Sequence, residues 1–209
     1  YGKEGATEYP DWLASIDLSD GGLYYYNAQY NVTNNNADSF IVEVIDAKTG
    51  NVVSSDSYSS GTLNAGEWIV KLMTYKGTEM CATTYSVKVE PAELAWSLSE
   101  FIGKEGFVKY TRNTAYVTYQ NGPNLYLKDS SGAMLVYSYN LPTFQSGDML
   151  DSFIGTYKDY NGTHEIIPVE STFSSFGNWG AQEPEVITLE QVTAENQNKY
   201  VDILKFIGT

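Results

Sequence analysis

The sequence is poor in the side chains that serve nucleophilic and metal chemistry, because its 209 residues include one histidine, His164, and one cysteine, Cys81. A serine or cysteine nucleophile needs a neighbouring base, and a structural zinc site needs four ligands, which these two residues cannot supply by themselves. A lone cysteine also cannot close a disulfide within the chain. We therefore expect no enzyme of this kind, no metal and no other cofactor.

The local sequence around both residues indicates ordinary structural roles. His164 lies in an expected turn, Asn161 to Glu165, where an exposed polar side chain is common. Cys81 follows Met80 and lacks the basic neighbour that would activate a thiol. Neither residue is a candidate catalytic group.

Basic residues are also scarce, since 12 Lys and Arg stand against 26 Asp and Glu and leave a net charge of −14. Proteins that bind nucleic acids neutralise phosphates with clustered lysines and arginines, and single-strand binders place such residues along a groove. The sequence has no basic cluster of this kind. A DNA or RNA partner is therefore not expected, and a single-stranded nucleic-acid module ranks third among the possible functions.

Long apolar runs are missing as well. No run approaches the roughly 20 residues of a membrane-spanning helix, and the sequence has no signal-peptide pattern. The chain begins at Tyr1 rather than at a methionine. From this we expect a processed or trimmed chain that derives from a longer protein.

What the sequence does contain indicates an all-β protein. Aromatic residues make up 14% of it, with 18 tyrosines and 18 glycines. The clearest pattern runs from Phe107 to Tyr139, where apolar and polar residues alternate as a strand with one buried face requires. The segments Asn121 to Asn124 and Asp129 to Gly132 interrupt it with turn-forming residues. Three consecutive antiparallel strands are predicted here.

A second set of strands is predicted in residues 23–90, where period-two segments of five to eight residues are separated by turn clusters about every ten residues. Tyr24, Tyr26 and Ala28 are expected to share one of these strands. The spacing is typical of an antiparallel sandwich. Residues 1–22 are expected to form a loosely ordered N-terminal arm that packs Ile16 and Leu18 on this first domain.

The boundary between the two domains is placed at Glu90 to Glu93, because Pro91 cannot donate a hydrogen bond to a strand ladder. The predicted division is an arm over residues 1–22, a sandwich over 23–90, a barrel over 94–176, and a linker with a final strand over 177–209.

Two segments resemble known modules. Gly61 to Lys71 is similar to a strand and turn of immunoglobulin-like domains in secreted bacterial surface proteins. Val117 to Tyr137, Gly147-Asp148 and Gly155 to Pro168 together resemble the OB-fold modules of secreted and lipid-anchored proteins of the Bacteroidetes. The resemblance implies an immunoglobulin-like β-sandwich followed by an OB-like Greek-key barrel, in a protein that is extracellular or on the outer cell surface.

The C-terminal segment is expected to contain an apolar strand. In multi-module relatives a segment like Pro184 to Val192 opens the next OB module, so the strand would start a further module or be donated to a neighbouring copy. A strand of this kind must be covered, because an unpaired apolar strand promotes aggregation. Packing on the edge of its own barrel is the third possibility. The residues of this assembly strand are Tyr200, Val201, Ile203, Leu204 and Phe206.

Tyrosines are the remaining candidates for binding. The resemblance implies a binding face on the second and third barrel strands, and tyrosine suits stacking on sugar rings or packing at protein interfaces. The inward-packed alternative applies to about half of the tyrosines of any strand. The candidate ligand-binding residues are Tyr126, Lys128, Tyr137, Tyr139, Tyr157 and Tyr160.

Carboxylates offer two weaker possibilities. Any two of them can meet as a glycosidase pair, although two small β modules rarely form the necessary cleft. Asp17 and Asp20 place oxygen atoms at the short spacing that calcium uses, but the loop lacks the full calcium-binding pattern. A plain turn is the expected structure there.

Two classes of function remain open from the sequence. One is a non-catalytic cell-surface module for adhesion or for binding a glycan or protein ligand. The other is a structural or assembly subunit, either pilus-like or a spacer, that oligomerises through the C-terminal strand.

Overall fold

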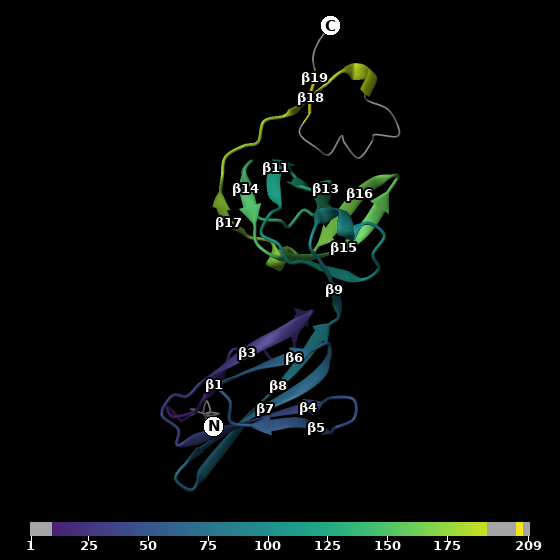
Figure 1. Ribbon diagram of the computed structural model, residues 1–209. Helices are drawn as coiled ribbons and strands as arrows, with labels where there is room; N and C mark the ends of the chain where they lie inside the picture. The colour runs from purple at the N-terminus through teal and green to yellow at the C-terminus, as the bar shows by residue number, and fades with distance from the viewer. Residues whose placement is uncertain (1–9, 192–203, 207–209) are drawn as a thin grey trace, which may run out of the picture. The chain divides into compact units, whose positions relative to one another are not determined.

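The protein is described by a computed structural model that covers residues 10–191 and 204–206 and consists of β-strands with three short 3-10 helices (Figure 1). The chain forms two compact units, Tyr1–Pro91 and Ala92–Thr209. The predicted all-β class, a sandwich followed by a barrel, is confirmed.

The first unit is a sandwich of two sheets. Its strands are β1 (Ser15–Ile16), β2 (Gly22–Tyr25), β3 (Asn27–Thr33), β4 (Ser39–Asp46), β5 (Val52–Asp56), β6 (Ser60–Asn64), β7 (Gly66–Lys76) and β8 (Glu79–Glu90). One sheet has the order β2-β8-β7-β4-β5 and the other the order β1-β3-β6. Buried residues of both sheets, such as Tyr30 and Val32 on β3 and Val42 on β4, share one core.

The first strands of the sandwich differ from the prediction. Tyr24 and Ala28 do not share a strand, because Tyr26 adopts a positive φ of 71° and the chain passes from one sheet to the other at this residue. As predicted, the arm packs on this domain, since Ile16 and Leu18 are buried in its core, but Ser15–Ile16 also form a strand, β1, that pairs with β3. The sandwich therefore includes residues from Ala14 onward, while residues 1–9 lie outside the described part.

The second unit is a barrel with strands added at its two edges. Its strands are β9 (Ala92–Ala95), β10 (Phe107–Tyr110), β11 (Tyr116–Asn121), β12 (Asn124–Asp129), β13 (Gly132–Tyr137), β14 (Asp148–Leu150), β15 (Phe153–Tyr160), β16 (Thr163–Pro168) and β17 (Ser175–Asn178). The 3-10 helices η1 (Leu98–Phe101) and η2 (Glu170–Thr172) lie between them. The barrel thus extends a few residues beyond the predicted 94–176 at both ends.

The order of the sheet, β17-β14-β11-β12-β13-β16-β15-β10-β9, gives the barrel an OB-like topology. β11, β12 and β13 form the predicted antiparallel meander, β13 then pairs in parallel with β16, and β16 forms a hairpin with β15. β15 pairs with β10, which leads directly along the chain into β11. β10 and β11 are thus consecutive along the chain and pair with β15 and β12, respectively, on the two sides of the curled sheet.

The predicted turns of the meander are present. β11 ends at Asn121 and β12 begins at Asn124, with Gly122 at a φ of 56° between them. The next turn joins Asp129 to Gly132, whose φ is 146°. Glycine is needed at these two positions because other residues rarely adopt positive φ.

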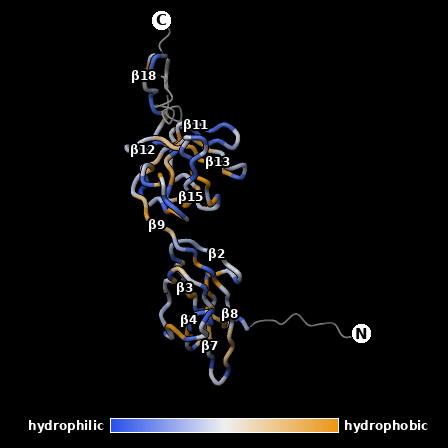
Figure 2. The backbone as a smooth tube through the Cα atoms, turned by 90° about the vertical axis from the view of Figure 1, so that its right-hand side faces the viewer, coloured by the Kyte–Doolittle hydropathy of each residue, from blue (hydrophilic) through white to orange (hydrophobic). Residues whose placement is uncertain are grey.

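The core of the barrel is formed by alternate residues of its strands. Hydrophobic and hydrophilic residues accordingly alternate along the tube in Figure 2. Phe153 lies at its centre, with the rings of Tyr110 and Phe173 at 4.8 and 4.6 Å between centroids. All three side chains are buried. Alternation on β12, β13 and β16 therefore leaves the intervening side chains on the outer surface of the barrel.

A buried carboxylate connects η1 to the β12–β13 turn. Asp129 is 5% exposed, and its two oxygens accept hydrogen bonds from the Leu98 backbone N–H at 2.8 Å, from the Ser131 N–H at 2.7 Å and from the Tyr110 hydroxyl at 3.2 Å. Burial, and to a lesser extent this carboxylate, raises the pKa of Tyr110 to about 12. The tyrosine therefore stays protonated, as a donor to Asp129 must.

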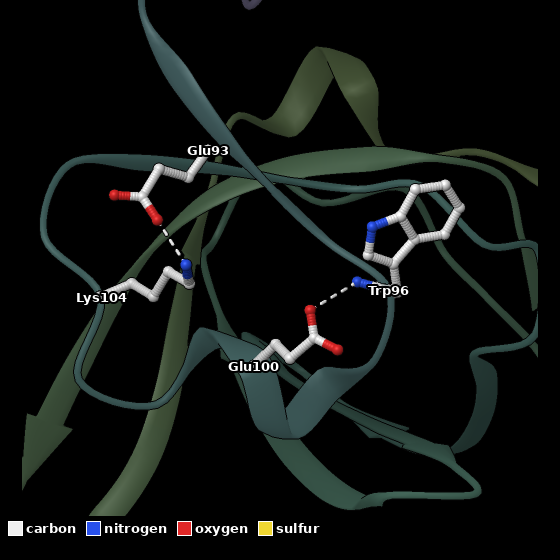
Figure 3. A network of polar contacts seen from close by, with 4 residues as sticks. All are labelled: Glu93, Trp96, Glu100 and Lys104. Atoms are coloured by element: carbon white, nitrogen blue, oxygen red, sulfur yellow. Dashed lines mark hydrogen bonds and ion pairs between the residues drawn. The ribbon is translucent and has the colours of Figure 1, made fainter.

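The segment that opens the second unit is held by polar contacts (Figure 3). β9 pairs in parallel with β10, Glu93 forms an ion pair with Lys104, and the backbone N–H of Trp96 donates to Glu100 at 3.0 Å. The indole ring of Trp96 takes no part in this hydrogen bond and is 56% exposed. These contacts fix η1 between β9 and β10.

The C-terminal segment contains two further strands. β18 (Glu185–Ile187) and β19 (Leu204–Phe206) pair in parallel, and the 3-10 helix η3 (Leu189–Gln191) follows β18. Leu204 and Phe206 of the predicted assembly strand thus lie in β19. Tyr200, Val201 and Ile203 lie outside the described residues.

Candidate functional site

Four strands of the barrel place tyrosines and charged side chains on one outer surface. Leu125 and Leu127 on β12 and Val136 on β13 point into the core, so Tyr126, Lys128 and Tyr137 lie on the opposite side of the same strands. On β13, β16 and β15 the residues Leu135, Glu165 and Lys158 are paired directly from strand to strand. We call the outer surface of these strands, which carries Tyr126, Tyr137 and Tyr160, the aromatic face.

The aromatic face is hollowed beside β13. A pocket of about 230 Å³ is lined by Tyr137, Lys158, Tyr160 and Glu165, which come from β13, β15 and β16. Tyr137 and Tyr160 are 36% and 55% exposed, whereas Glu165 is 7% exposed. The pocket therefore combines accessible tyrosine side chains with one buried carboxylate and one surface ammonium group.

Tyr139 extends the aromatic face beyond the end of β13. Its ring stands edge-on to that of Tyr137, with 5.8 Å between centroids and 76° between planes, and its hydroxyl accepts a hydrogen bond of 3.2 Å from Tyr137. This hydrogen bond, followed by desolvation and by the negative charge of Glu165, raises the pKa of Tyr137. The Tyr137 hydroxyl accordingly remains a neutral donor at physiological pH.

The charged groups of the pocket lie next to the aromatic rings. The Lys158 ammonium lies over the ring of Tyr160, 4.9 Å from its centroid, which is the geometry of a cation–π interaction. Lys158 and Tyr160 are two residues apart on β15 and so share its outer side. Glu165 on β16 faces Lys158 across the strand pair.

The predicted binding residues are distributed unequally. Tyr137 and Tyr160 line the pocket, Tyr139 contacts Tyr137, and Tyr126 is the diagonal neighbour of Tyr137 across β12 and β13. Tyr126 also stacks on the exposed ring of Tyr119 at 6.1 Å. Four of the six predicted residues are therefore grouped around the pocket or directly beside it.

The other two predicted residues do not line the pocket. Lys128 is on the outer side of β12, opposite Tyr116 and Ala133, and is half-buried. Tyr157 lies on the inner side of β15, where it packs against the core and its hydroxyl is 2.9 Å from Nδ1 of His164. His164 is thus half-buried beside a tyrosine rather than exposed in the turn.

Two residues of the pocket were not predicted. Lys158 has the period-two spacing to Tyr160 that places both on one side of a strand, so a signal for it was present in the sequence. Glu165 reaches the pocket through the parallel pairing of β13 with β16. That pairing joins strands far apart in the sequence, and no local pattern reveals it.

The carboxylates considered for calcium are engaged in hydrogen bonds. Asp17 accepts from the backbone and side-chain nitrogens of Asn31 at 2.6 and 2.9 Å, and these bonds lower its pKa. Asp20 accepts from the Ser86 N–H at 2.7 Å. Across residues 10–191 and 204–206, no three His, Cys, Asp or Glu side chains gather as a metal site would require. These contacts tie the segment to β3 and β8, and the predicted turn is present beside them, where the Gly22 N–H donates to the Ser19 carbonyl at 3.0 Å.

Comparisons with known proteins show distant structural likeness alone. No family model and no curated protein matches the chain. A β-glucuronidase of Bacteroides uniformis is similar over 59% of this chain at 10% identity and a TM-score of 0.31. The three N-terminal domains of the bacteriophage RB49 outer capsid protein Hoc match 74% at 9% identity and a TM-score of 0.28.

A quinonprotein alcohol dehydrogenase-like protein of Bacteroides thetaiotaomicron matches 79% of the chain at 10% identity and a TM-score of 0.26. The chain covers 15%, 65% and 39% of the lengths of these three proteins, respectively. Separately, in the part of the chain that the structure describes, no helix has the length and apolar character to cross a membrane.

Proposed function

We propose that this chain is a non-catalytic binding module of an extracellular or cell-surface protein and that the aromatic face of its barrel binds a carbohydrate. The observation that carries the proposal is the pocket lined by Tyr137, Lys158, Tyr160 and Glu165, with Tyr126 and Tyr139 beside it. Tyrosine rings stack on the apolar faces of sugars, while their hydroxyls and nearby charges bind sugar hydroxyls.

The position of the pocket supports the same function. OB-like barrels bind oligosaccharides or oligonucleotides on the face of their second and third strands. In this barrel those strands are β12 and β13, which carry Tyr126 and Tyr137. The net charge of −14 disfavours the oligonucleotide, because a polyanion would be repelled at long range.

Replacing Tyr137 by alanine is expected to weaken carbohydrate binding by about ten-fold or more, because it removes one aromatic wall of the pocket. The test is a glycan array probed with the intact chain, followed by calorimetric titration of the oligosaccharides that bind. Tyr58→Ala is the matched control, since Tyr58 is a 73% exposed tyrosine of the sandwich. No binding by the intact chain, or equal loss in both variants, would refute the proposal.

The alternative is an assembly subunit that uses the C-terminal strand. β19 is already paired with β18 in its own chain along one edge, which leaves this alternative with less support. Light scattering over a range of concentrations distinguishes the two functions. We expect the intact chain and a chain that ends at Pro184 both to be monomeric, whereas oligomers of the intact chain alone would favour assembly through β18 and β19.

A further inference from the structure

We propose that the pocket on the aromatic face recognises a positively charged ammonium group, and that the carbohydrate it binds is an amino sugar with a free, protonated amino group. This inference rests on the proposed function, because it specifies the class of sugar. It starts from the pairing of aromatic rings with a buried carboxylate in the pocket lined by Tyr137, Lys158, Tyr160 and Glu165.

The aromatic residues favour a cation. Aromatic faces attract ammonium groups through the negative potential above the ring. Tyr160 already holds one such group, since the ammonium of Lys158 lies 4.9 Å from its ring centroid. The rings of Tyr137 and Tyr139 stand at 76° to each other, so two further aromatic rings lie at the pocket. The protein's own lysine thus occupies the kind of position that we assign to the ligand.

The carboxylate favours the same charge. Glu165 is 7% exposed in the wall of the pocket and lies opposite Lys158 on the paired strand, and no buried side-chain oxygen of the described residues lacks a hydrogen-bond partner. A ligand ammonium that enters the pocket would meet this carboxylate as a further opposite charge. An anionic sugar would instead place its charge beside Glu165 and above the negative faces of the rings, with Lys158 as the favourable contact.

The charge of the whole chain acts in the same direction. With 12 basic and 26 acidic residues, the protein attracts cationic ligands and repels anionic ones at long range. A polymer of amino sugars carries many positive charges, so this attraction also accelerates its association. On the aromatic face such a polymer could stack its sugar rings on tyrosines and pair its ammonium groups with negative charge.

The test compares two oligosaccharides that differ only in this charge: a short oligomer of glucosamine and the same oligomer with every amino group acetylated. Both are titrated into the intact chain by calorimetry in slightly acidic buffer, where the free amino groups are protonated. We expect the glucosamine oligomer to bind roughly ten-fold more tightly, as a cation–π contact with a nearby carboxylate implies. Equal or tighter binding of the acetylated oligomer would overturn the inference but leave carbohydrate binding intact.

Two variants determine the origin of the preference. Lys158→Met removes the internal cation with little change in length, so binding of the glucosamine oligomer should tighten, whereas weaker binding of this cationic oligomer would mean that Lys158 supports the site instead of competing with the ligand ammonium and would overturn the inference. Glu165→Gln keeps the shape of the side chain and should remove the preference for the charged oligomer; a retained preference would also overturn the inference. Circular dichroism of both variants checks that the barrel is folded. If neither oligomer nor any array glycan binds, the proposed function fails together with this inference.

Discussion

Replacing Phe153 by alanine is expected to lower the free energy of unfolding of the barrel unit by about 3–5 kcal/mol, the range for the removal of a buried aromatic side chain. Phe153 is fully buried, and its ring packs on Tyr110 and Phe173 and lies 6.0 Å from Phe101. These residues belong to four different segments of the barrel. Because neighbours from several segments surround the ring, we expect little of the cavity to be filled by rearrangement.

The measurement is urea unfolding of the intact chain, monitored by hydrogen exchange. Hydrogen exchange reports on the peptides of each unit separately. Phe176→Ala is the matched control, because Phe176 is 45% exposed in the same unit and pairs with the exposed Trp179. The Phe176→Ala variant should lose no more than about 1 kcal/mol of the free energy of unfolding. If Phe153→Ala were no more destabilising than Phe176→Ala, the core described above would be wrong.

Replacing Asp129 by alanine should cost about 3 kcal/mol, because hydrogen bonds to a buried charged acceptor are lost together and their donors are left behind. The Leu98 N–H, the Ser131 N–H and the Tyr110 hydroxyl all donate to this carboxylate. Loss of these bonds releases η1 from the β12–β13 turn. Asp129→Asn should cost less, since the amide keeps one acceptor oxygen.

Thermal unfolding of the two variants measures this difference, with Asp151→Ala as control. Asp151 is exposed and its side chain accepts a hydrogen bond from the adjacent Ser152 N–H. We expect Asp151→Ala to change the stability by no more than about 0.5 kcal/mol. Equal stability of the Asp129→Ala and Asp151→Ala variants would show that the carboxylate does not hold η1 in place.

The local features of the barrel could be predicted from the sequence. Period-two alternation located β11, β12 and β13, and the Asn-Gly and Ser-Gly turns located their connections, because both signals depend on neighbouring residues. The parallel pairing of Leu135 with Glu165 has no local signal. It determines which charged residues reach the pocket, so the tyrosines were found and Glu165 was missed.

Prediction of the sandwich from the sequence was limited in the same way, by features that neighbouring residues do not reveal. Tyr24, Tyr26 and Ala28 alternate as a single strand would, but Tyr26 adopts a left-handed backbone conformation and separates β2 from β3. Tyrosine rarely adopts positive φ, so the sequence gives no sign of this break. Ile16 and Leu18 enter the core as expected, but the strand that Ser15 and Ile16 form beside β3 depends on a pairing that a segment rich in Asp, Ser and Gly does not indicate.

We propose that the aromatic face binds the carbohydrate, and locating the bound ligand tests this most sharply. The intact chain, labelled with ¹⁵N, is titrated with an oligosaccharide that it binds, and the amide signals that shift are assigned. We expect shifts concentrated on β13, β15 and β16 around Tyr137, Tyr160 and Glu165, with β12 affected next. Shifts confined to the sandwich, or to the barrel surface away from these strands, would contradict it.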